Sequence, residues 1–146
     1  MKINRRTALA ALAMAFTKPA FAATIEAVLY KNPQCSCCEV YAAYLGDNGF
    51  TVDVKSVNNL SQISADAGVP PELQGCHTMM VGGYAVDGLV PVDIVRKLLA
   101  EKPAIAGITL PGMPAGAPGM GGTKTGPWVI SAFTKDGQPP TVFATV

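Results

Sequence analysis

Residues 25–48 read IEAVLYKNPQCSCCEVYAAYLGDN, and this stretch decides the fold. Ile25–Tyr30 is rich in branched and aromatic residues, which predicts a β-strand. Residues 31–34 contain Asn and Pro, which are typical of a turn. Residues 39–48 predict a helix that Gly49 ends, with Val40, Tyr41, Tyr44 and Leu45 on its inner side. The cysteine-rich segment CSCC therefore lies between a strand and a helix.

The following segments extend this unit into an α/β domain. Alternation predicts a strand at 50–57, and a helix capped by Ser61 is expected at 62–67. A hairpin with strands at 78–81 and 84–86 turns at Gly82-Gly83, and a helix follows from Pro91 to about Glu101. This order resembles a thioredoxin-like βαβ-α-ββ-α domain, which we expect to span residues 23–109.

The chain continues beyond that domain. Residues 110–127 are rich in Gly, Pro and Met, a composition that excludes regular helix or strand. Two strand-like segments, 128–133 and 141–146, flank Asp136-Gly137. They predict an extra C-terminal β-hairpin over residues 128–146.

Residues 1–22 have the pattern of a bacterial secretory signal peptide. Lys2, Arg5 and Arg6 form a positive start, and residues 7–17 are almost entirely apolar but too short to span a bilayer. Small residues at Ala20 and Ala22 predict cleavage after Ala22. The Arg pair also fits a twin-arginine signal, so the Sec and twin-arginine routes both stay open. We expect a periplasmic protein with no membrane span after cleavage.

Removing this segment changes the charge of the chain. Lys+Arg would fall from 11 to 7 while all 10 acidic residues remain, so the formal net charge would be about −3. Nucleic-acid binding depends on neutralising phosphates with basic residues. The sequence therefore excludes a nucleic-acid partner.

The cysteines at 35, 37, 38 and 76 are candidate metal ligands. Cys35 and Cys38 form a C-x-x-C pair at a helix start, where free backbone N–H groups favour thiolates. Cys37 has no obvious role in a two-cysteine redox cycle. The Cys76-His77 pair precedes the third strand, and the expected fold brings it to the C-x-x-C loop. We predict a site with these four sulfurs and His77, the only histidine of the chain.

Several interpretations of the cluster stay open. Soft thiolates select Cu(I), zinc or iron–sulfur clusters. Crowded thiolates in an exported protein favour Cu(I) over zinc. The cluster could hold one copper ion or several. Alternatively, the thiols pair as the disulfides Cys35–Cys38 and Cys37–Cys76. Such a disulfide-bonded form is also compatible with metal binding after reduction.

Two methionines are candidate accessory ligands. Met113 and Met120 lie in the Gly/Pro/Met-rich loop, and thioether sulfur is a soft Cu(I) ligand. Composition alone favours the alternative, in which both simply pack on the domain surface. Lys31, close before Cys35, is a weak candidate for lowering a thiol pKa.

The motifs together resemble a known family, the CopG-like periplasmic copper-resistance proteins, long described as a domain of unknown function. The resemblance runs from about Ile25 to Gly122. It rests on these segments: Tyr30-Lys31, Cys35-Ser36-Cys37-Cys38, Gly75-Cys76-His77-Thr78, Gly83-Tyr84, Val90-Pro91, Pro111-Gly112-Met113-Pro114 and Pro118-Gly119-Met120. It implies a thioredoxin-like fold and copper held by Cys35, Cys37, Cys38 and Cys76, with His77 beside them.

This chain departs from the family pattern at two positions. Leu89 stands where the family usually has a histidine before Val-Pro, and Tyr41 stands where a tryptophan is common. Because imidazole suits Cu(II) better than thioether does, the first change argues for a Cu(I) binder over a copper oxidoreductase.

The leading hypothesis is a copper-binding protein for copper resistance or homeostasis, with redox cycling of copper as an open addition. Its partners would be copper ions, periplasmic copper-handling proteins or a reductant. The alternatives are a thioredoxin-like thiol–disulfide oxidoreductase acting through Cys35 and Cys38, and a disulfide-stabilised interaction domain. Whether the protein is an enzyme stays open at this point.

Overall fold

The structure, a computed structural model, describes residues 23–146. The predicted signal peptide at 1–22 lies outside the described residues. The helices are α1 (Ser36–Asp47), α2 (Leu60–Asp66) and α3 (Val92–Glu101), with a short 3₁₀ helix at Pro71–Leu73. The strands are β1 (Ile25–Lys31), β2 (Phe50–Ser56), β3 (His77–Val81), β4 (Tyr84–Gly88), β5 (Gly107–Leu110), β6 (Val129–Phe133) and β7 (Thr141–Thr145).

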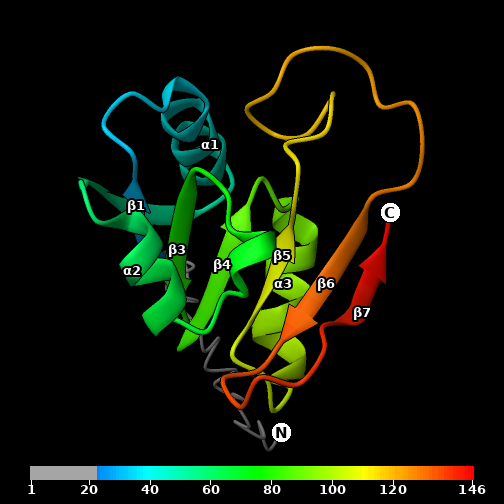
Figure 1. The fold of residues 1–146 in the computed structure, drawn as a ribbon. Coiled ribbons are helices and arrows are strands. Elements are labelled where there is room, and N and C mark those ends of the chain that lie inside the picture. The colour runs from blue at the N-terminus through cyan, green and yellow to red at the C-terminus, as the bar shows by residue number, and fades with distance from the viewer. Residues whose placement is uncertain (1–22) are drawn as a thin grey trace, which may run out of the picture.

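A single seven-stranded sheet organises the described part of the chain, in the order β2-β1-β3-β4-β5-β6-β7 (Figure 1). β1 runs parallel to β2, and β3 pairs antiparallel with both β1 and β4. β5 returns parallel to β4, and β6 and β7 continue antiparallel. The α/β class and the predicted order of strands and helices through α3 are confirmed.

Helices cover both faces of the sheet. Residues of α1 (Tyr41, Leu45) and α3 (Leu98) pack in one buried cluster with Leu29 and Met79 of the central strands. Neighbouring residues of a strand point to opposite faces. Thr78, next to Met79, contacts Ser64 of α2 across the other face. The core between α1, α3 and the sheet includes Cys38, so it reaches the CSCC segment.

The C-terminal strands differ from the prediction in their role. The hairpin exists as β6 and β7, but it extends the main sheet through β5, a strand that the sequence did not predict. Gly107 lets β5 approach β4, because a Cβ there would lie 2.0 Å from the Ala85 carbonyl oxygen. Leu110 ends β5, so it is not the first residue of the loop.

Two details of the helices were predicted wrongly. α1 begins at Ser36, and Val40 is 55% exposed, because the buried stripe is Cys38, Tyr41 and Leu45. α2 begins at Leu60 after Asn59, so Ser61 is inside the helix and does not cap it. The buried residues of α3 are Val92, Ile94, Val95 and Leu98, whereas Leu99 is partly exposed.

The Gly/Pro/Met-rich loop after β5 arches beside the start of α1 (Figure 1). Ala117 is buried in the main core and anchors the loop to the domain. Gly119 lies against the first turn of α1, where a Cβ would come within 2.8 Å of the Cys37 carbonyl oxygen. This contact brings the loop to the cysteine cluster. No helix of residues 23–146 is long and apolar enough to cross a membrane.

Candidate metal centre

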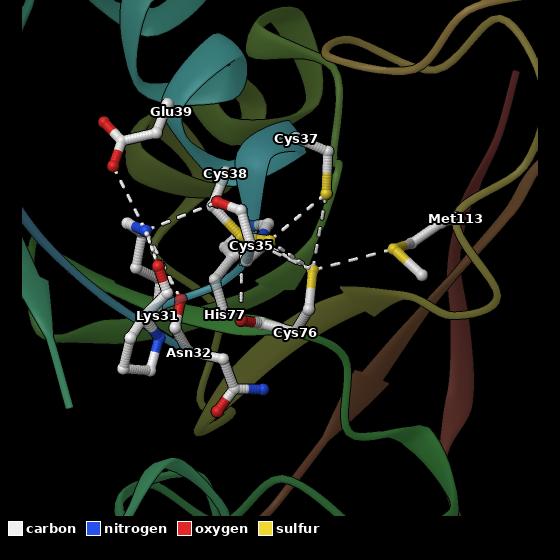
Figure 2. The surroundings of a disulfide bond; sticks show 10 residues. Lys31, Asn32, Cys35, Cys37, Cys38, Glu39, Cys76, His77 and Met113 are labelled. Carbon is white, nitrogen blue, oxygen red and sulfur yellow. Dashed lines mark hydrogen bonds and ion pairs between the residues drawn. A yellow bond between two sulfur atoms is a disulfide. The ribbon is translucent and has the colours of Figure 1, made fainter. Parts of the chain in front are cut away.

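Three segments bring the cysteines together. Cys35 precedes α1 as its N-cap residue, and Cys37 and Cys38 lie in its first turn. Antiparallel pairing of β1 with β3 sets Lys31 opposite His77, which places Cys76 beside the β1–α1 loop. Figure 2 shows the four sulfur atoms converging from these segments.

The sulfur atoms form a tight group. All four Sγ atoms lie within 4.8 Å of one another. Cys76 is central, with its Sγ 3.1 Å from Cys35, 3.4 Å from Cys38 and 3.6 Å from Cys37. The structure therefore unites all four predicted cysteines in one group of soft donors.

Two of these sulfurs are covalently joined. Cys35 and Cys38 form a disulfide, whereas Cys37 and Cys76 are free thiols among the described residues. The first of the two predicted pairings is present and the second is not. The structure therefore represents an oxidised form, in which two of the four thiolates are not available as ligands.

His77 is buried beneath the sulfurs. Its Nδ1 lies 3.6 Å from Cys38 Sγ and 3.9 Å from Cys76 Sγ. The side chain has no exposed surface, and Nε2 has no hydrogen-bond partner among residues 23–146. Burial lowers the pKa of His77 to about 4, with the Gly88 backbone opposing this in part. The ring is therefore neutral at pH 7, and one of its two nitrogens carries a free lone pair.

Cys76 is a protonated thiol at neutral pH. Burial raises its pKa to about 12, and its contact with Cys37 raises it further in the same direction. A metal ion that binds this sulfur must displace the proton, because the thiolate is the ligand.

Lys31 holds the loop that carries Cys35. Its buried ammonium donates to the carbonyl oxygens of Asn32, Pro33 and Cys35, each at 3.3 Å. It also lies 3.1 Å from a carboxylate oxygen of Glu39, in the first turn of α1. Lys31 thus anchors the β1–α1 loop, a larger role than the weak electrostatic one that the sequence predicts.

The two methionines of the loop differ. Met113 Sδ lies 3.6 Å from Cys76 Sγ. Its backbone has φ of +44°, a left-handed conformation that is uncommon outside glycine and costs on the order of 1–3 kcal/mol. Met120 is exposed and has no sulfur–sulfur contact with the cluster within the described residues. The structure therefore brings Met113, but not Met120, to the sulfurs.

A cavity of about 550 Å³ opens over the cluster. It gives Cys35, Cys37, Cys76 and Met113 access from outside. Uncharged residues form the rest of its lining: Asn32, Pro33, Gln34, Ser36 and Asn58. A small cation or a reductant can therefore reach the sulfurs without crossing a charged rim.

Comparison with solved structures identifies relatives of the chain. Two of them are "Copper resistance protein copG- Form 1" and "Copper resistance protein copG- Form 2". Each is 30% identical to this chain with a TM-score of 0.76, and the match covers 84% of this chain and 98% of the solved one. This chain belongs to the CopG-like family. A family described as "Protein of unknown function, DUF411" also matches residues 73–120, and no curated protein matches.

The two positions that depart from the CopG-like pattern are both buried. Leu89 contributes an apolar side chain to the core. Tyr41 donates a hydrogen bond to the Val90 carbonyl oxygen at 2.7 Å, and its ring centroid lies 5.0 Å from that of His77. Among the described residues His77 is thus the one imidazole near the sulfurs, and Tyr41 packs against it.

Proposed function

We propose that this CopG-like protein binds copper as Cu(I) in the periplasm, for copper resistance or homeostasis. Cys35, Cys37, Cys38 and Cys76 would be the ligands, with His77 beside them and Met113 as an accessory ligand. The observation that carries the proposal is the convergence of four Sγ atoms within 4.8 Å of one another, with a thioether 3.6 Å from the central one. Both structural relatives are copper resistance proteins by name, which supports the same metal.

The donor set favours Cu(I) over zinc. Zinc binds thiolate, imidazole and carboxylate groups, whereas thioether sulfur is a ligand of the softer Cu(I). Met113 is held near Cys76 in a strained backbone conformation, which supports a role for its sulfur. A neutral His77 adds no charge that would repel a cation.

Loading requires a two-electron reduction of the Cys35–Cys38 disulfide. The bond takes up two electrons and two protons from a dithiol reductant, which becomes a disulfide, and yields two thiols. Copper binding then releases thiol protons to water. The cavity over Cys35 gives such a reductant an approach to the half-buried sulfur of that residue.

The alternative is a thiol–disulfide oxidoreductase. The disulfide at the N-terminus of α1, with Cys35 accessible and Cys38 buried, favours it. The two functions need different residues. Exchange needs Cys35 and Cys38 alone, whereas a copper cluster also needs Cys37 and Cys76.

An anaerobic titration tests this difference. Reduced protein is titrated with Cu(I) against a competing chelator, and disulfide reductase activity is measured on a model protein disulfide. We expect Cys37→Ser to lose copper, whereas its exposed neighbour Ser36→Ala, the matched control, keeps it. Full reductase activity without copper binding by the wild type would establish the alternative.

A further inference from the structure

A buried carboxyl group lies directly behind the Cys76-His77 pair. Asp87 of β4 has no exposed surface, and it pairs with Thr78 across the β3–β4 ladder. Its Oδ1 accepts a hydrogen bond from the backbone N–H of Gly75 at 2.7 Å, and its Oδ2 lies 2.7 Å from the Thr78 hydroxyl. One side chain therefore binds the residue before Cys76 and the residue after His77.

This arrangement fixes which way the pair points. Thr78 faces Asp87 and α2, so His77 must point to the opposite face, where its Nδ1 meets Cys38. Gly75 is required for the approach of the carboxyl group, because a Cβ there would lie 2.9 Å from Asp87 Oδ1. The segment that carries both candidate ligands is thus held at each end from behind the sheet.

The hydrogen bonds continue from Asp87 into α2. The Thr78 hydroxyl lies 2.7 Å from the Ser64 hydroxyl, which donates to the Leu60 carbonyl oxygen at 2.9 Å. The Thr78 hydroxyl donates to Asp87 Oδ2, so three contacts link Asp87 to Leu60 through Thr78 and Ser64. Burial raises the pKa of the Asp87 carboxyl to about 6, and the two hydrogen bonds that it accepts, from the Thr78 hydroxyl and from the Gly75 N–H, oppose this rise in part.

We propose that Asp87 is a positioning residue for Cys76 and His77, acting through Gly75 and Thr78 as part of a hydrogen-bonded chain that ends at Leu60. That these two residues are copper ligands rests on the proposed function. That Asp87 fixes their orientation rests only on the contacts above.

The proposal distinguishes two substitutions at the same site. Asp87→Asn keeps an acceptor for the Gly75 N–H and keeps a hydrogen-bonding group beside the Thr78 hydroxyl. Asp87→Ala removes both contacts. Ile130 is fully buried in β6, which β5 separates from β4 in the sheet. Ile130→Ala therefore serves as a control that destabilises the core without removing a hydrogen bond of Asp87.

The first readout is competitive Cu(I) binding by the three variants at matched folded fraction. We expect Asp87→Ala to bind copper on the order of tenfold to a hundredfold more weakly, as is common for groups that orient metal ligands. Asp87→Asn and Ile130→Ala should bind as the wild type does. Equal binding by Asp87→Ala and Ile130→Ala would overturn the proposal.

The second readout needs no copper, so it separates this inference from the proposed function. The oxidised protein is treated with iodoacetamide, and the modification of Cys76 relative to Cys37 is measured by mass spectrometry. We expect the ratio to rise several-fold in Asp87→Ala only, because Cys76 loses its fixed position while Cys37 stays on α1. An unchanged ratio in Asp87→Ala, or the same rise in Asp87→Asn, would overturn the positioning role even if the wild type binds copper.

Discussion

Substituting Asp87 by Asn should change how the stability of the metal-free, oxidised protein depends on pH. The folded state binds a proton at Asp87 below about pH 6, whereas the unfolded chain does so only near 3.8. Binding of this proton adds to the free energy of unfolding in acid, and this contribution is lost as pH rises through 6. Since one pKa unit corresponds to about 1.36 kcal/mol, the loss between pH 4 and 7 is about 2 kcal/mol.

His77 acts in the opposite direction over the same pH range. Its pKa falls from 6.5 in the unfolded chain to about 4 in the folded state. Stability is therefore lost as pH falls from 6.5 to 4, by about 3 kcal/mol on the same conversion. In the wild type, the pH dependence of stability caused by Asp87 and that caused by His77 act in opposite directions and offset each other. Asp87→Asn removes the first, so the loss of stability in acid caused by His77 should then be measurable.

Urea unfolding followed by circular dichroism at pH 4, 5, 6 and 7 measures this effect. The free energy of unfolding of Asp87→Asn minus that of the wild type should be about 2 kcal/mol larger at pH 7 than at pH 4. Asp47→Asn, at an exposed position in α1, controls for the substitution itself. A difference between Asp87→Asn and the wild type that stays constant with pH would refute the assigned titration of Asp87.

Three further substitutions test other parts of the site. Met113→Leu should weaken Cu(I) binding about tenfold, or about 1.4 kcal/mol, in a competition titration, whereas Met120→Leu, which lacks the sulfur contact, should not. Lys31→Met should lower the free energy of unfolding by about 2 kcal/mol, because three carbonyl oxygens lose a charged donor, and denaturant titration measures this. Gly119→Ala should destabilise the loop by at least about 1 kcal/mol, since the added Cβ would meet the Cys37 carbonyl oxygen in a left-handed backbone conformation. Unchanged melting temperatures in Lys31→Met and Gly119→Ala would argue against these contacts.

Local sequence patterns predicted most of the domain up to residue 101. The strand before the CSCC segment, the helix after it and the β3–β4 hairpin all follow from short-range residue patterns. The cysteine cluster was also predictable, because the strand–helix junction and the start of β3 meet at the same end of the sheet.

Features that depend on tertiary pairing were not predictable in the same way. β5 is four residues long and begins with glycine, so its identity as a strand comes from pairing with β4 and β6 and not from local preference. Asp87-Gly88 has the pattern of a turn, yet both residues belong to β4 and Asp87 is buried. Its partners Gly75 and Thr78 are distant in sequence, so no local pattern signals this network.

The most direct test of copper binding by the cysteine cluster is copper K-edge X-ray absorption of the reduced, copper-loaded protein. The account predicts a Cu(I) edge and a first coordination shell dominated by sulfur, which Cys37→Ser should abolish or deplete. A shell of nitrogen and oxygen donors, or protein that retains no copper after desalting, would contradict it.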